Sequence, residues 1–448
     1  MSLPAPASPA PFTSGASAAP SAVRVALLGC GTVGTQVARV LVEHGEEIGA
    51  RVGAPVELVG VGVRDAAADR DPAVPRDLLT GDADALVARA DVVVELIGGT
   101  TRARELVHAA IRNGASVVTA NKALLAAHGP ELYEAADAAG VDILYEAAVA
   151  GAVPVVRGVR ESLAGDRVQR VLGIVNGTTN YILDQMTTGG LDFADALARA
   201  QELGYAEADP TADVEGYDAA AKAAILASLA FHTRVSMDDV AREGITSITA
   251  RDIDTARRMG GVIKLLAIVE RVATADGEAV ALRVHPAVLP AAHPLAGVGG
   301  AFNAVVVEAE AAGRLMFYGA GAGGRPTASA VLGDVVAAAR HRVQGGRAPA
   351  ESAYAELPLA SPDHVRSRMQ MTLEAEDRPG VLARIASLVA DNGVSIESVQ
   401  QSPSTSGTAV LVVVTHDADE ASLARTVAAL REAHELTEIL AVHRVERP

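Results

Sequence analysis

The sequence predicts an α/β protein that begins with a parallel sheet, continues with an α+β segment and ends with a small βαββαβ unit. Up to about residue 151, short runs of Val, Ile and Leu alternate with segments of helical period. Such runs are typical of parallel strands that are buried on both faces. The alternation loosens between about 152 and 320, and a new strand–helix–strand–strand–helix–strand order starts near residue 369. That order is typical of a ferredoxin-like domain.

The first part of the chain predicts five strands with helices between them. An apolar strand that begins near Val23 leads into a Gly-rich turn and a helix that ends at Gly45. The other strands are expected at Val56–Val63, Asp91–Gly99, Ser116–Lys122 and Val141–Gly151, with a helix from about Thr101 to Asn113. Residues 21–151 then form one domain. Residues 1–20, mainly Pro, Ala and Ser, are expected to be a disordered tail.

The middle of the chain predicts a second, α+β domain at residues 152–325. Helices are expected at Phe193–Leu203 and Asp218–Phe231, and strands at Ala304–Glu310 and Arg314–Tyr318. The amphipathic segment Pro326–Arg342 predicts a helix that packs back on the first domain. Residues 343–368 hold Gly, Pro, Ala and charged residues without a period, which predicts a loose linker.

The last domain is expected at residues 369–448. Its four strands are predicted at Gln370–Glu376, Ser395–Gln401, Thr408–Thr415 and Thr437–Val445, and its two helices at Gly380–Asn392 and Ala421–Ala433.

Composition excludes several classes of function. The 448 residues include 38 Lys and Arg against 55 Asp and Glu, a net charge of −17, which argues against a nucleic-acid or anionic-membrane partner. No apolar run approaches the ~18–20 residues that span a bilayer, and the first basic residue is Arg24, so we expect a cytoplasmic protein. Cys30 is the only cysteine, and neither H-x-x-x-H nor G-x-S-x-G occurs. Cysteine-based zinc sites and serine-hydrolase chemistry are therefore not expected.

A Gly-rich turn follows the first predicted strand and opens a helix. Its residues Gly29, Gly31 and Gly34 form G-x-G-x-x-G around Thr32 and Val33. In this setting the glycines let the backbone approach a pyrophosphate at the helix N-terminus, which predicts a Rossmann-type dinucleotide-binding domain. The alternative is a tight strand-to-helix turn without a ligand.

The end of the second predicted strand bears on the choice of cofactor. Arg64 stands where NAD enzymes usually carry an acidic residue, and an arginine there can pair with the 2′-phosphate of NADP. Asp65 beside it keeps NAD open, and Arg64 could instead be a solvated surface residue. NADP is the favoured cofactor, with NAD as the alternative.

Polar residues also end the next two predicted strands, at Glu95–Thr100 and Thr119–Lys122. Ligands bind at the carboxyl ends of strands in open α/β sheets. Lys122 is therefore interpreted as a cofactor or substrate contact rather than a surface charge at a helix end.

The densest polar cluster lies between Glu202 and Lys222 and precedes an apolar helical run. Asp218 and Lys222 are four residues apart and share a helix face. They form either an ordinary surface salt bridge or a buried lysine that moves a proton to and from an alcohol oxygen, with Asp218 holding it. Spacing alone does not decide between these two readings.

Several motifs together resemble homoserine dehydrogenase over about residues 23–342. They are GCGTVG, the NK of TANK, YEAAVAGAVPVV, NGTTNYIL, ELGYAEADPTADVEGYDAAAK and YGAGAGGRPTASA. The segment Asp377–Gln401, DRPGVLARIASLVADNGVSIESVQQ, resembles an ACT domain, an amino-acid-sensing module. With no aspartokinase-like segment in the sequence, the chain is similar to the monofunctional bacterial form.

This resemblance implies reversible NAD(P)H-dependent reduction of L-aspartate 4-semialdehyde to L-homoserine, a step toward threonine, methionine and isoleucine. Lys222 matches the catalytic proton donor, Lys122 the second active-site lysine, and Asp218 a catalytic and substrate-binding carboxylate. Glu207 and Asp213 match further substrate-binding positions. The implied cofactor contacts are Gly29, Gly31, Thr32, Val33, Gly34, Arg64, Thr100, Lys122, Gly204 and Gly321.

The family also binds a monovalent cation, usually sodium, and assembles as a dimer or a dimer of dimers. Glu146, Val149, Gly151 and Val153 match the sodium site, with one carboxylate and three backbone carbonyls. In the ACT-like segment, Asp377 and Gly380 are the expected effector contacts, and threonine is the expected effector. The alternative for this segment is a dimerising module that no longer senses a ligand.

Three other functions fit the sequence less well. An amino-acid dehydrogenase acting on aspartate leaves the 201–222 block unexplained, and a nucleotide-sensing regulator has no need of both Lys122 and Lys222. Aspartate-semialdehyde dehydrogenase needs a cysteine nucleophile, and Cys30 lies in the phosphate loop instead.

Overall fold

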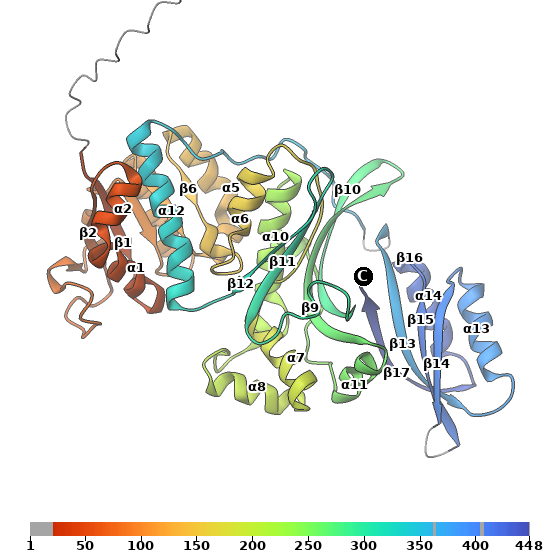
Figure 1. Cartoon of the computed structure of the whole chain (residues 1–448). Coiled ribbons are helices and arrows are strands. Elements are labelled where there is room, and N and C mark those ends of the chain that lie inside the picture. Colours follow the sequence, from red (N-terminus) through yellow and green to blue (C-terminus); the bar gives the residue numbers. More distant parts are fainter. Residues whose placement is uncertain (1–20, 362–363, 404–406, 448) are drawn as a thin grey trace, which may run out of the picture.

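The computed structural model describes residues 21–361, 364–403 and 407–447 (Figure 1). The predicted disordered tail at residues 1–20 lies outside these residues. Two sheets organise the described chain: a six-stranded sheet in the first domain and an eleven-stranded sheet that runs through the second and third domains. Within these residues, no helix combines the length and the apolarity that crossing a bilayer requires.

The first domain is a parallel sheet of strand order β3-β2-β1-β4-β5-β6. Its strands are β1 (Val23–Leu28), β2 (Val56–Gly62), β3 (Leu79–Thr80), β4 (Val92–Glu95), β5 (Ser116–Thr119) and β6 (Ile143–Leu144). Its helices are α1 (Thr32–Glu43), α2 (Gly45–Val52), α3 (Ala83–Val87), α4 (Thr101–Arg112) and α5 (Lys122–Ala139). This is the Rossmann strand order, so the predicted fold class is confirmed, and the order reverses between β1 and β4.

Three predicted strands are shorter than expected. The third ends at Glu95 rather than Gly99, and the fourth ends at Thr119, because the Asn121 side chain accepts from Leu124 N at 3.0 Å and caps α5. Lys122 is therefore the first residue of a helix and not the end of a strand. The fifth strand keeps only Ile143–Leu144 before a 3₁₀ turn at Glu146–Ala148.

The second domain packs helices on an antiparallel sheet. Its strands are β7 (Val168–Ile174), β9 (Gly261–Thr274), β10 (Gly277–Pro290), β11 (Phe302–Ala309) and β12 (Gly313–Ala320), with the short β8 (Ala241–Arg242) beside β10. Its helices are α6 (Val155–Arg157), α7 (Gly177–Gly189), α8 (Phe193–Glu202), α9 (Thr211–Val214), α10 (Tyr217–Phe231) and α11 (Ala250–Arg258), with a π-helical turn at Gly158–Ser162. The long β9–β10 hairpin and α7 were not among the predicted elements.

Helix α12 (Gly324–Gln344) returns to the first domain and crosses it beside α1 (Figure 1). Ala328, Val331 and Val335 are buried in the same apolar cluster as Val25 and Val37. The first domain is therefore completed by a helix that follows the second domain in the sequence.

The predicted loose linker covers residues 343–368. Within it, residues 345–361 are hydrogen-bonded to the second domain. Ala355 N donates to His232 O at 3.0 Å, and Val280 N donates to Pro358 O at 2.9 Å. Buried backbone groups need such partners. This segment, which we call the strap (residues 345–361), is thus held against the second domain.

The third domain has the predicted βαββαβ order. It consists of β13 (Arg366–Glu376), α13 (Val381–Asp391), β14 (Ile396–Pro403), β15 (Thr408–Thr415), α14 (Glu420–Arg431) and β17 (Leu436–Val445), with the short β16 (Ala418–Asp419) added.

This domain is joined to the second domain through its sheet. Val445 of β17 pairs with Val288 of β10 in parallel register, so one sheet runs from β12 to β14. Arg170 and Glu446 form an ion pair at 2.7 Å across the same junction.

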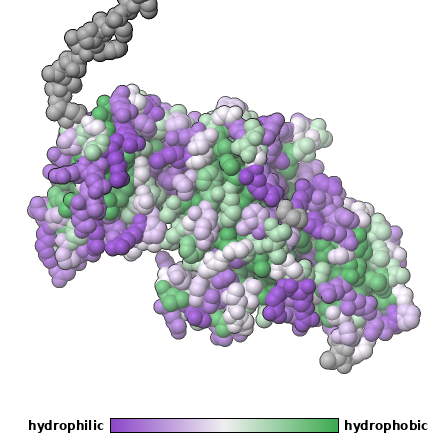
Figure 2. Space-filling model, in the orientation of Figure 1, coloured by the Kyte–Doolittle hydropathy of each residue, from purple (hydrophilic) through white to green (hydrophobic). Residues whose placement is uncertain are grey.

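Figure 2 shows one face of the molecule, with hydrophilic residues over much of the first domain and hydrophobic residues gathered toward the middle and over part of the third domain.

Candidate active site

The Gly-rich turn follows β1 at the carboxyl edge of the first sheet. Gly29 has φ +100°, a left-handed conformation that favours glycine. A Cβ on Gly34 would lie 2.1 Å from Gly29 O, so α1 can pack this closely on the turn only with glycine there. A Cβ on Gly31 would meet nothing within 4 Å. The turn therefore leaves open space at Gly31, where a pyrophosphate can approach the backbone.

The N-terminus of α1 faces that space with backbone amides. Gly31 is the N-cap, and no side chain caps the helix. Thr32 and Val33 are the first two residues of the helix, where N–H groups have no partner inside the helix. A Cβ on Gly324 would lie 3.0 Å from Thr32 O, so the start of α12 lies directly beside this N-terminus.

Two arginines follow β2 near the same turn. Arg64 is exposed, and no ion pair engages it among the described residues. Arg70, which the sequence did not single out, donates to Cys30 O and to Asp65 O, both at 3.1 Å. Arg70 thus ties the segment after β2 to the Gly-rich turn and leaves Arg64 free to meet a ligand.

Lys122, Asp218 and Lys222 meet at the junction of the first two domains. Lys222 Nζ donates to Asp218 Oδ2 and to Val175 O, each at 2.7 Å. Lys122, at the N-terminus of α5, forms an ion pair with the other oxygen of Asp218. The side chains of Asp218 and Lys222 are 6% and 10% exposed, whereas that of Lys122 is 43% exposed. The surface salt bridge considered from spacing is therefore wrong, because the pair is buried.

Burial and the neighbouring charges both shift the pKa values of these groups. Burial alone would raise the pKa of Asp218, but the ammonium groups of Lys222 and Lys122 hold it well below its ordinary value. Burial lowers the pKa of Lys222, and the charge of Lys122 adds to this, while Asp218 opposes both. The result is a lysine that releases its proton more readily than a lysine in water does.

Asn176 is a member of this cluster that the sequence argument missed. Its Nδ2 donates to Asp213 Oδ1 at 2.6 Å and to Asp218 Oδ2 at 2.9 Å, and its Oδ1 accepts from Thr179 N to cap α7. Burial raises the pKa of Asp213. The helix-start pattern Asn-Gly-Thr-Thr at 176–179 was the available signal, since asparagine is a preferred N-cap.

Asn303 is a second residue that was missed. It is fully buried on β11, and its Nδ2 donates to Val175 O at 3.0 Å, the same carbonyl that Lys222 binds. A Cβ on Gly321 would lie 2.3 Å from the Asn303 side chain, and one on Gly151 would lie 2.3 Å from Gly321 O. Gly321 therefore lies between the β11 strand and the turn at 151, and Gly324 contacts α1.

The remaining predicted contacts lie around this centre without a direct bond to it. Glu207 and Gly204 are exposed in the segment after α8, which Thr178 holds by donating to Tyr205 O at 2.6 Å. Thr100 is the half-buried N-cap of α4. It follows Gly99, whose carbonyl accepts from Asn121 Nδ2 at 2.7 Å.

The turn after β6 holds the predicted cation ligands. Glu146 is buried, and its two carboxylate oxygens accept from Val156 N at 2.8 Å and Arg157 N at 2.9 Å. Val153 O accepts from Val155 N, whereas no hydrogen bond to Val149 O or Gly151 O occurs among the described residues. Burial raises the pKa of Glu146. One buried carboxylate and two carbonyls without a hydrogen bond among the described residues offer hard oxygen ligands, which fit a small hard cation.

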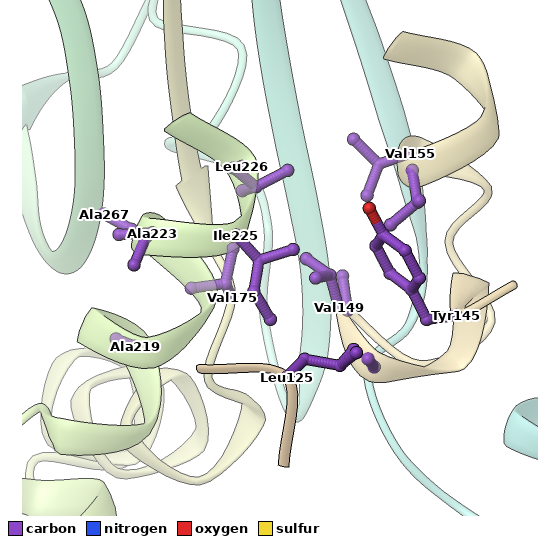
Figure 3. Close-up of a cluster of buried hydrophobic side chains, with 14 of the residues drawn as sticks. Leu125, Tyr145, Val149, Val155, Val175, Ala219, Ala223, Ile225, Leu226 and Ala267 are labelled. Atoms are coloured by element: carbon purple, nitrogen blue, oxygen red, sulfur yellow. The ribbon is translucent and has the colours of Figure 1, made fainter. Parts of the chain in front are cut away.

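An apolar cluster joins this turn to α10. Figure 3 shows Val149 of the turn facing Ile225 of α10, with Leu125 of α5 below them and Val155 of α6 beside Tyr145. The position of Lys222 on α10 is thus set by packing against both domains.

The third domain has a cavity of about 360 Å³ at its first strand-to-helix turn, lined by Asp377, Gly380 and Gln401 among others. Gly380 caps α13 with φ +95° and without a side-chain cap. Both predicted effector residues therefore line one cavity.

Comparison with known proteins decides the family. The family model of homoserine dehydrogenase matches residues 154–336, that of the homoserine dehydrogenase NAD-binding domain matches 29–146, and that of the ACT domain matches 370–435. A homoserine dehydrogenase of Corynebacterium glutamicum is 57% identical over 430 residues, which is 95% of this chain and 96% of that protein. The chain belongs to the homoserine dehydrogenase family. This family assignment excludes the aspartate-acting and nucleotide-sensing alternatives.

Solved structures agree with this assignment. The homoserine dehydrogenase of Thiobacillus denitrificans is 39% identical, covers 96% of this chain and 99% of its own, and has a TM-score of 0.87. A hyperthermophilic archaeal homoserine dehydrogenase in complex with NADPH is 28% identical, covers 71% and 97%, and has a TM-score of 0.58. As a homoserine dehydrogenase, the chain is an oxidoreductase whose first domain serves a nicotinamide dinucleotide and whose third domain is an ACT domain.

Proposed function

We propose that the chain catalyses the reversible reduction of L-aspartate 4-semialdehyde to L-homoserine, with Lys222 as the proton donor. The observation that carries this role is the bonding of Lys222. An ammonium group has three N–H donors. Two of them are bound by Val175 O and Asp218 Oδ2, which leaves one donor for a substrate oxygen.

The proposed chemistry follows from that geometry. The nicotinamide, when bound, supplies the hydride that reaches the aldehyde carbon. Lys222 donates a hydrogen bond to the aldehyde oxygen and transfers its proton as negative charge develops there. Asp218 holds Lys222 in place and stabilises its charged form, while the more exposed Lys122 at the start of α5 is the second lysine proposed to contact cofactor and substrate.

Acidic residues around the cluster suit the substrate's ammonium group. Both oxygens of Asp218 are engaged by the lysines and Asn176. We therefore assign the ammonium contact chiefly to Asp213 and Glu207, with Asp218 acting as the positioning carboxylate of Lys222.

We propose NADP as the preferred cofactor. Two observations support this proposal: Arg64 after β2 is exposed, and a guanidinium can pair with a 2′-phosphate; and an archaeal relative was solved in complex with NADPH. Thr32, Val33, Thr100, Gly204 and Gly321, together with the glycines at 29, 31 and 34, are the proposed dinucleotide contacts.

We propose a sodium ion at Glu146, Val149, Gly151 and Val153, where it would fix the turn between the first two domains. We also propose that threonine binds the ACT-domain cavity, with Asp377 meeting its ammonium and the N-terminus of α13 at Gly380 meeting its carboxylate.

Copies of the chain are proposed to associate as a dimer or a dimer of dimers. The support is an exposed apolar group at the free edge of the long sheet, where Phe302 and Tyr318 stack at 5.3 Å beside Met316. Light scattering on the purified protein tests this proposal.

One experiment tests the reaction, the cofactor and the effector together. Purified protein is mixed with homoserine and either NADP⁺ or NAD⁺, with and without threonine, and nicotinamide absorbance is followed. We expect faster reduction of NADP⁺ and suppression by threonine. Turnover that is unchanged by threonine would refute only the proposal that threonine is the effector. Absence of turnover with both cofactors would refute the proposed reaction.

A further inference from the structure

A cavity of about 760 Å³ lies apart from the proposed active site, between α5, α10 and the strap. This volume is in the range of ~300–1,000 Å³ that is usual for small-molecule sites. Leu125 of α5 and Ile225 of α10 line it, each three residues after Lys122 and Lys222 respectively. Figure 3 shows these two side chains and Tyr145 approaching from three separate segments.

Most of the charged groups that line this cavity are already paired. Arg347 bonds to Asp137 at 2.9 Å, and Arg234 bonds to Glu351 at 2.6 Å. Two further acids have partners as well: Asp142 bonds to His341 and to Ala348 N, and Asp239 bonds to Ser236.

Arg160 is the least completely paired of these groups. Its side chain is 12% exposed, and its closest carboxylate in the described chain is Glu161 at 3.9 Å. Its Nε is buried and has no hydrogen-bond partner. The Tyr145 hydroxyl accepts from this guanidinium, so the group left without an acceptor is Nε and not the whole side chain. A buried N–H without an acceptor is costly, and a carboxylate is the group that best satisfies a guanidinium.

Aromatic rings stand beside this guanidinium. The Arg160 guanidinium lies 5.6 Å from the centre of the Tyr145 ring, and the rings of Tyr145 and Tyr133 are 5.7 Å apart. His232 stacks on Tyr354 at 4.9 Å on another part of the wall. The cavity thus combines a cation whose Nε has no acceptor with flat apolar surfaces.

We propose that this cavity binds a small organic carboxylate, with its carboxylate on Arg160 and its apolar body against Tyr133 and Tyr145. The ligand lies between the two helices that carry Lys122, Asp218 and Lys222. Its binding therefore biases the contact between those helices and couples to homoserine binding. The coupling rests on the proposed function, whereas the binding itself does not.

The test is direct binding to the full-length protein without nucleotide or homoserine. Isothermal titration calorimetry uses phenylacetate as the probe, with phenyl phosphate and benzyl alcohol as comparison ligands. Arg160→Gln removes the charge, Arg160→Lys keeps it without the fork, and Arg347→Gln is the matched control in the same cavity.

We expect phenylacetate to bind, and its affinity to fall by about tenfold or more in Arg160→Gln, as for loss of a charged hydrogen bond. The affinity of Arg160→Lys for phenylacetate should lie between those of Arg160→Gln and the unaltered protein. The affinity of Arg347→Gln should equal that of the unaltered protein. Saturating homoserine with NADP⁺ should leave the ligand bound. Absence of phenylacetate binding, equal binding by Arg160→Gln, tighter binding of phenyl phosphate, or displacement by homoserine would each overturn the proposal.

Discussion

Lys122 and Asp218 form an ion pair between the first helix turn after β5 and the first turn of α10, so one contact joins the two domains at the candidate active site. Asp218 simultaneously accepts from Lys222. A single buried carboxylate therefore links the dinucleotide-binding domain to the proposed proton donor. Its negative charge raises the pKa of that donor.

Replacing Lys222 with Ala should reduce turnover by about 10²–10⁴-fold, the usual contribution of a general acid. NADPH affinity should stay nearly unchanged, because Lys222 bonds to Val175 and Asp218 rather than to the Gly-rich turn. Steady-state kinetics and NADPH fluorescence titration measure the two quantities. Loss of NADPH binding in this variant would count against the proton-donor role.

The pH profile of aldehyde reduction should depend on Asp218. Reduction needs protonated Lys222, so its rate falls as pH rises through the pKa of that lysine. Asp218 raises this pKa against burial and against Lys122. Asp218→Asn should therefore move the alkaline limb of kcat/KM to lower pH.

Asp213 supplies the matched comparison for that shift. It acts on the pKa of Lys222 in the same direction but as the smallest of the named causes. Asp213→Asn should give a smaller shift than Asp218→Asn. Equal shifts, or none, would show that Lys222 is not the titrating donor.

Arg64→Ala should change cofactor preference. If Arg64 pairs with a 2′-phosphate, kcat/KM for NADP⁺ should fall by about 10–100-fold, the range for a charged hydrogen bond, while the value for NAD⁺ stays the same. The exposed Arg112 at the end of α4 provides the control variant, Arg112→Ala. An equal loss with both nucleotides would contradict the 2′-phosphate assignment.

Asn176 has two separable roles. It caps α7 and it bridges Asp213 and Asp218. Asn176→Ser should keep the cap but lose the bridge, and should raise the KM for homoserine by about tenfold. Asn176→Ala should show the same KM and also lose ~1 kcal/mol of stability with the cap. Thermal unfolding and kinetics on both variants measure this difference, and an unaltered KM in Asn176→Ser would refute the bridge.

Lys264 should make the free energy of unfolding increase with pH in the alkaline range. It is buried on β9 and bonded to Asn180 and Val298 O, and burial lowers its pKa to about 8. Between pH 8 and the ordinary value of about 10.5, the unfolded chain binds this proton and the folded chain does not, so the free energy of unfolding rises with pH.

Denaturant unfolding of Lys264→Met supplies the comparison. The free energy of unfolding of the unaltered protein, minus that of the variant, should rise by about 3 kcal/mol across that window. This figure comes from converting the pKa shift to energy. A constant difference from pH 7 to 10 would show that Lys264 stays protonated.

The sequence by itself determined the features that depend on local spacing. The glycines at 29, 31 and 34 specify their turn through φ values and close approach, and these conditions lie within a few residues. Asp218 and Lys222 share a helix face for the same local reason. The βαββαβ order of the last domain is also readable, because each of its elements has its own hydrophobic period.

Only the tertiary structure decided what those local features meet. The choice between a surface salt bridge and a buried pair at Asp218 and Lys222 depended on α10 packing against β9, β10 and the turn after β6. Asn176 and Asn303 reach the site from two different elements, and β17 docks on β10 from the far end of the chain. Contacts between segments this distant in sequence are set by how two sheets and their helices fit together, and no residue pattern within one segment encodes that fit.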